Sequence, residues 1–212
     1  MSCPICEKRK PGRFCPAKGE RICAVCCGTE REVTLDCPAD CAYLLSAHRY
    51  EEEHRKPFPP DTPFLDARFS ADIIYSRQSE LAGVAFAIAK FCTGQPDASD
   101  SDVLAALASL AEAYKTLATG IYYEKPPDRP APRALYGELA KFLANLKQGE
   151  AERSGFSTLK DSEIFALLVF LYRMGLLHAN GRPRSRKFIE YLHAQFPKSE
   201  DRVREEPRII VP

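Results

Sequence analysis

The stretch CPICEKRKPGRFCPAKGERICAVCCGTEREVTLDCPADC, residues 3–41, contains eight of the nine cysteines of a chain of 212 residues. Two cysteine pairs in it have the spacing C-x-x-C, which lets both thiolates bind one ion from the same tight loop. Such a pair is half of a tetrahedral zinc site with four sulfur ligands. Eight ligands make two complete sites of the closed, structural type, so we predict two zinc ions per chain, bound by Cys3, Cys6, Cys15, Cys23, Cys26, Cys27, Cys37 and Cys41.

The order of the cysteines favours a cross-brace, in which the two zinc sites interleave along the chain. We expect Cys26 and Cys27 on an extended backbone, because neighbouring side chains there point to opposite faces and can serve different ions. A sequential pairing, with the first four and the last four cysteines on separate ions, is the less favoured alternative. In the cross-brace, one ion is bound by Cys3, Cys6, Cys23 and Cys26, and the other by Cys15, Cys27, Cys37 and Cys41.

The spacing C-x2-C-x8-C-x7-C-x2-C, followed by C-x3-C, resembles the B-box class of two-zinc cross-brace modules, to which MYND and HIT fingers are related. The resemblance covers residues 3–45 only. The B-box pattern has a ligand three residues after the third cysteine, where this chain has Lys18. Cys27 would take the role of that ligand, and His48 is the leading substitute ligand for the second site. The segments CCGT and CPADCAYL also resemble an uncharacterised group of bacterial proteins, which implies no activity.

Structural zinc is favoured over two other uses of these cysteines. A redox-active dithiol of the thioredoxin type needs a βαβ context, which the surrounding sequence lacks. An iron–sulfur cluster uses the same four thiolates and stays an alternative. The segment is too poor in apolar residues to fold without metal, its large ones being Ile5, Phe14, Ile22, Val25, Val33 and Leu35.

Composition indicates a soluble globular protein, with 45% hydrophobic residues, 28% charged residues and a net charge of +1. Residues 1–20 lack the apolar core of a signal peptide, and the longest apolar run, 164–172, is far shorter than the ~20 residues that span a bilayer. We therefore expect a cytoplasmic protein without a membrane segment. A reducing compartment disfavours disulfides, which again favours metal binding by the paired cysteines.

The chain divides into four parts by its sequence pattern. Residues 1–56 form the two-zinc module with a trailing helix, and the proline-rich residues 57–63 form a semi-rigid linker. Residues 64–197 show helical periodicity throughout and predict an all-α bundle of about five helices, and residues 198–212 form a charged tail that we expect to be flexible. The predicted fold is a small zinc-stabilised irregular or α+β module followed by an all-α helical bundle.

Within the bundle, five helices are expected from apolar spacing. The run IFALLVFLY, residues 164–172, is apolar on all sides and predicts the most buried helix, which a capping box of Thr158 and Asp161 would begin. Cys92 is expected to be a buried thiol and not a ligand. The predicted helices cover about 64–92, a segment beginning near 101, 135–146, a segment beginning near 161, and 185–196.

No enzymatic motif is present: the sequence has no glycine-rich phosphate loop, nucleophile elbow or metalloprotease helix. We predict a non-enzymatic zinc-binding adaptor or regulator that acts through contacts with an unknown protein partner. The alternative is a nucleic-acid-binding regulator that uses the basic turn at 182–187, with Arg182, Arg184, Arg186 and Lys187. The metal-loaded module would be acidic overall, which disfavours that alternative.

Overall fold

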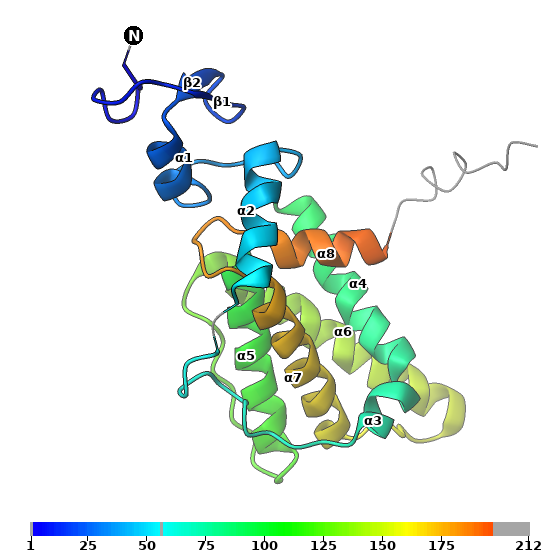
Figure 1. Cartoon of the computed structure of the whole chain (residues 1–212). Helices are drawn as coiled ribbons and strands as arrows, with labels where there is room; N and C mark the ends of the chain where they lie inside the picture. The colour runs from blue at the N-terminus through cyan, green and yellow to red at the C-terminus, as the bar shows by residue number, and fades with distance from the viewer. Residues whose placement is uncertain (1, 56, 197–212) are drawn as a thin grey trace, which may run out of the picture.

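The computed structural model describes residues 2–55 and 57–196. A small N-terminal module sits on one end of a helical bundle, and the helix that follows the module runs down along the bundle (Figure 1). The described part of the chain contains one two-stranded sheet and eight helices, so the predicted combination of a small mixed module and a helical bundle is confirmed at this level.

The N-terminal module is built on a hairpin and two helices. Strands β1 (Arg13–Cys15) and β2 (Glu20–Ile22) pair antiparallel, with Phe14 opposite Arg21. The turn between them contains Gly19 at φ +68°, a left-handed conformation that glycine adopts without steric cost. Helix α1 (Ala24–Glu30) follows directly, and α2 (Ala42–Glu53) leads toward the bundle.

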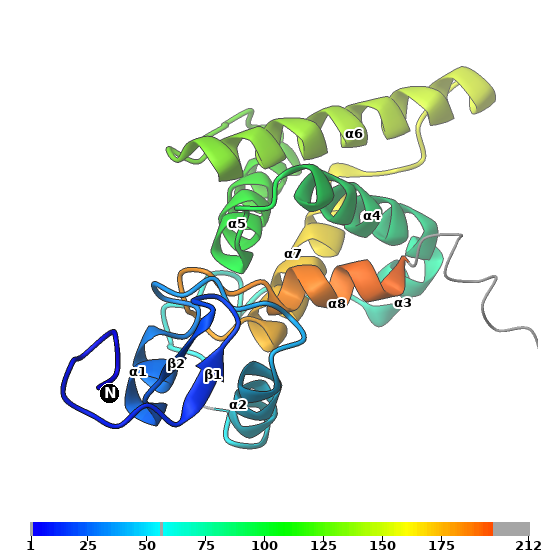
Figure 2. The same cartoon turned by 90° about the horizontal axis from the view of Figure 1, so that it is seen from above.

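The bundle consists of six helices in the described residues. They are α3 (Ala71–Ser76), α4 (Gln78–Gly94), α5 (Asp100–Leu117), α6 (Pro130–Ser154), α7 (Asp161–His178) and α8 (Lys187–Gln195). Figure 2 shows α6 along the face of the bundle that lies farthest from α2.

Helix α7 is the most deeply buried helix, as its apolar sequence predicts. Its Ile164, Leu168 and Val169 are fully buried, and it packs closely against α5. The packing is tight enough that Gly175 has no room for a side chain: a Cβ atom there would lie 2.7 Å from Leu104 and 3.0 Å from Phe188. Cys92 is also buried, as expected, at 1% exposure.

Two of the predicted helices have other boundaries in the structure. The single helix expected over 64–92 is wrong. Phe64 has φ +60°, which is not a helical conformation, and α3 begins only after Ser70, whose side chain accepts the backbone N–H of Asp72. Arg77 then separates α3 from α4. Helix α6 runs well beyond the expected 135–146, with a proline in its first turn where a missing N–H is tolerated.

The predicted capping box of α7 is also wrong. The carboxylate of Glu163 accepts the backbone N–H of Lys160 at 2.9 Å and so caps the helix. Thr158 instead donates its hydroxyl to Glu150 at 3.1 Å. The capping box of α7 therefore begins at Lys160, two residues later than predicted, and Thr158 binds the end of α6.

The module and the bundle have separate apolar cores. The module's core consists of Ile22, Leu35 and buried cysteines, and the bundle's core is a much larger cluster drawn from α4 to α8. The expected tail, 198–212, lies outside the described residues. None of the described helices has the length and hydropathy of a membrane span.

Candidate metal centre

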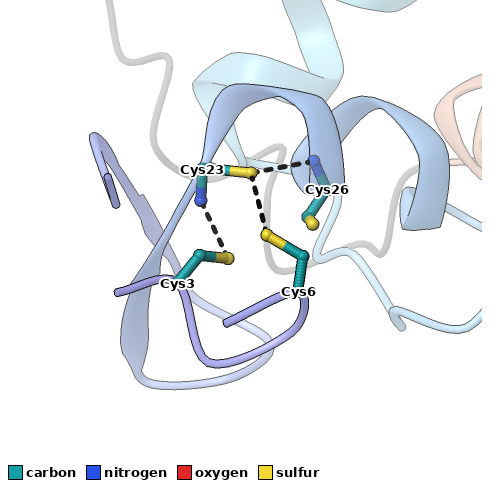
Figure 3. Close-up of side chains that lie close together, drawn as sticks. All are labelled: Cys3, Cys6, Cys23 and Cys26. Carbon is teal, nitrogen blue, oxygen red and sulfur yellow. Dashed lines mark hydrogen bonds between the residues drawn. The ribbon is translucent and has the colours of Figure 1, made fainter. Parts of the chain in front are cut away.

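Four cysteines of the module converge on one point. The ligand atoms of Cys3, Cys6, Cys23 and Cys26 all lie within 4.8 Å of one another. Figure 3 shows the four side chains directed into a common space, two from the first loop and two from the beginning of α1, and the Sγ atoms of Cys6 and Cys23 are 3.9 Å apart. Sulfur atoms at this spacing match the donor set of a tetrahedral zinc site.

Local backbone geometry creates both halves of this group. In the first loop, Glu7 adopts φ +55° and donates its N–H to the carbonyl oxygen of Cys3 at 2.7 Å, which closes the turn around Cys6. In the second, Cys23 is the N-cap of α1, and its sulfur accepts the N–H of Cys26 at 3.4 Å. The two halves meet where the N–H of Cys23 donates to the sulfur of Cys3 at 3.2 Å.

These four cysteines can all be ionised together only if a cation lies between them. The backbone N–H groups of Lys8 and Arg9 lower the pKa of Cys6 to about 6. Burial, together with the neighbouring sulfurs of Cys23, Cys6 and Cys3, raises the pKa of Cys26 to about 12. Four thiolates so close together repel one another, and a divalent metal ion supplies the charge that lets all of them ionise.

An arginine accompanies the group. The guanidinium of Arg9 lies against the sulfurs of Cys6 and Cys23, which raises the pKa of Arg9. A dication with four thiolates has a net charge of about −2. The positive charge of the neighbouring guanidinium offsets part of this negative charge when a metal ion is bound. The residues present therefore fit a closed metal site.

The other four predicted ligands are gathered but less tightly. Cys15, Cys27, Cys37 and Cys41 line one small pocket of about 10 Å³ together with Arg31 and Leu44. Burial raises the pKa of the Cys37 thiol, and the nearby Cys41 and Cys15 raise it further. Among the residues described, the close convergence of four ligand atoms occurs in the first group and does not extend to this one.

The expected extended backbone at Cys26 and Cys27 is wrong, because both residues lie in α1. Adjacent helical positions are separated by about 100° around the axis. Cys26 therefore joins the first group while Cys27 lines the pocket of the second, so a helix achieves the separation that we expected of a strand.

His48, the leading substitute ligand in the prediction, is buried at 7% exposure. Its Nε2 lies 3.2 Å from both carboxylate oxygens of Glu32 and it does not line the second pocket. Sequence reasoning missed this pair, because a histidine and a glutamate separated by 16 residues have no shared pattern.

The basic turn at 182–187 makes mostly internal contacts. Arg182 donates to the carbonyl oxygens of Gly28 and Arg31, the latter at 2.6 Å. Arg186 donates to the carbonyl oxygens of Pro96 and Ala98, and Lys187 pairs with Glu52 at 2.6 Å. Arg184 alone of the four cations has an exposed side chain.

No protein-family model, curated protein or solved structure matches this chain. The resemblance to B-box, MYND and HIT fingers therefore stays a prediction from cysteine spacing.

Proposed function

We propose that the N-terminal module binds two structural zinc ions in a cross-brace and that the protein is a non-enzymatic adaptor or regulator. The observation that carries this proposal is the convergence of Cys3, Cys6, Cys23 and Cys26 within 4.8 Å. All four ligands are cysteines, so a metal ion there is fully coordinated by protein and has no open position for water or substrate.

The second ion is assigned to Cys15, Cys27, Cys37 and Cys41. Their shared pocket of about 10 Å³ is close to the space that a single water molecule needs, so one ion fits. Arg31 lines the same pocket, and its buried Nε–H has no hydrogen-bond partner among the described residues. A thiolate ligand of the second ion would accept a hydrogen bond from this N–H. The positive charge of Arg31 would then offset part of the negative charge of the second site, as Arg9 does at the first.

Partner binding is supported by exposed apolar side chains on the module. Phe14 is 54% exposed, and Val25, Tyr43 and Leu45 are also open to solvent. On the bundle, the loop after α5 exposes Tyr122 at 76%. Aromatic residues at the surface are common anchors of protein interfaces. The reducing cytoplasm is the proposed location, because it keeps the eight thiols available to metal.

The nucleic-acid alternative is less favoured. Arg182, Arg186 and Lys187 are engaged within the protein, which leaves Arg184 as the one exposed cation of the turn. A nucleic-acid complex would lose affinity steeply with salt, and neutralising these four residues would flatten that dependence.

A pull-down with the zinc-loaded full chain tests the adaptor proposal. We expect a partner protein, identified by mass spectrometry, that stays bound after nuclease treatment and is lost when Phe14 and Tyr43 are both replaced by serine. Binding that nuclease abolishes would contradict the proposal and support the alternative.

A further inference from the structure

Glu32 lies between the second cysteine group and the helical bundle. It is 3% exposed and adopts φ +53°, a left-handed conformation that is uncommon for a residue with a side chain. Burial raises the pKa of the Cys37 thiol, and the backbone of Glu32, which lies near this thiol, acts to lower it by a smaller amount. Glu32 therefore lies beside one of the four proposed ligands of the second site.

Glu32 is held at three points, two of which come from the bundle. The side chain of Asn180, in the loop between α7 and α8, donates to the Glu32 carboxylate at 2.8 Å. The backbone N–H of Arg184, in the same loop, donates to the Glu32 carbonyl oxygen at 2.9 Å. His48 of α2 contacts both carboxylate oxygens from another side.

The same loop also holds the helix that carries Cys27. Arg182 donates to the carbonyl oxygens of Gly28 and Arg31 at 3.3 and 2.6 Å, at the C-terminal end of α1. These carbonyls have no partner within the helix, and a cation there also favours the helix dipole. The backbone at 28–32, between the proposed ligands Cys27 and Cys37, is thus anchored to the α7–α8 loop.

The first cysteine group lacks such contacts with the bundle in the described structure. Its sulfurs accept hydrogen bonds from the backbone N–H groups of Cys23 and Cys26, and the other backbone groups that lower the pKa values of Cys3 and Cys6 belong to residues 5–9. All of these residues belong to the module itself. The two proposed sites therefore differ in where their outer-shell partners originate.

We propose that the α7–α8 loop, through Asn180 and Arg182, is the outer shell of the second zinc site, so that the bundle sets how tightly this site holds its ion. The inference rests on the second zinc ion of the proposed function. Outer-shell groups fix the orientation of the ligands, and their loss commonly weakens metal binding by about 10–100-fold. The first site is independent of the loop.

The test is the rate of zinc release from the full chain to a chromogenic chelator. The wild type should release two zinc ions, and the variant Cys37→Ser should release one, whose rate defines the first site. In the double variant Asn180→Ala/Arg182→Ala we expect one ion to leave about 10-fold faster or more, and the other at the rate of the first site. Circular dichroism checks that the bundle stays helical.

Arg184→Ala is the matched control. It removes a cation from the same loop but keeps the backbone N–H that binds Glu32, so its release rates should equal those of the wild type. Two zinc ions that leave the double variant at wild-type rates, or that both accelerate equally, would overturn the inference and leave the two-zinc proposal intact. A wild type that holds only one ion would overturn both.

Discussion

The amide of Asn180 donates a 2.8 Å hydrogen bond to the carboxylate of Glu32, and this contact joins two parts of the chain that are 148 residues apart. Glu32 belongs to the cysteine-rich module, and Asn180 follows the central helix of the bundle. A proline-rich linker suggests two independent parts, yet a buried polar network fixes them to each other.

Replacement of His48 by leucine should destabilise the packing of α2 against Glu32. The Glu32 carboxylate would lose one of its buried partners, and an unsatisfied buried group costs about 1–3 kcal/mol. Urea unfolding of the zinc-loaded protein, followed by circular dichroism, should show this loss. The control His54→Leu changes an exposed histidine of the same segment and should leave the unfolding midpoint unchanged.

Overpacking at Gly175 should lower the free energy of unfolding of the bundle. The new methyl group of Gly175→Ala would meet Leu104 at 2.7 Å and Phe188 at 3.0 Å, and such strain costs about 1–3 kcal/mol. Gly137→Ala is the matched control, because that site in α6 is open and alanine there should stabilise the helix by about 0.5–1 kcal/mol. Equal urea midpoints for the two variants would contradict the packing described for α7.

Cys92 should resist alkylation in the folded protein at pH 8. It is buried, and burial raises the pKa of its thiol to about 11 from the usual 9.0. The unfolded chain therefore loses this proton first, and stability should fall as the pH rises from about 9 to about 11. Mass spectrometry after iodoacetamide treatment checks the first expectation, and urea midpoints for the wild type and Cys92→Ala across this pH range check the second.

Removal of one ligand of the first group should unfold the module and spare the bundle. Cys23→Ser deletes a thiolate ligand while its hydroxyl keeps a side-chain cap on α1, and the module has little apolar core to compensate for the lost metal. The bundle keeps its own core, so hydrogen exchange should rise across residues 3–41 while α4, α5 and α7 stay protected. Uniform loss of protection would show that the bundle depends on the module.

Periodicity and spacing predicted what depends on local pattern. The apolar run at 164–172 correctly predicted that α7 is buried. The two C-x-x-C pairs correctly predicted that Cys3, Cys6, Cys23 and Cys26 come together. Contacts between distant segments escaped prediction. The roles of His48 and Arg182 depend on partners far along the chain, and neither residue type indicates on its own whether it is buried or solvated.

The most direct measurement is zinc X-ray absorption spectroscopy on the full chain, combined with elemental analysis of protein purified without added metal. We predict two zinc ions per chain, each surrounded by four sulfur atoms at about 2.3 Å. This prediction would be contradicted by one zinc ion per chain, by iron in place of zinc, or by nitrogen or oxygen ligands around the ions. Each of these results would show that the eight cysteines do not supply all the ligands of two zinc ions.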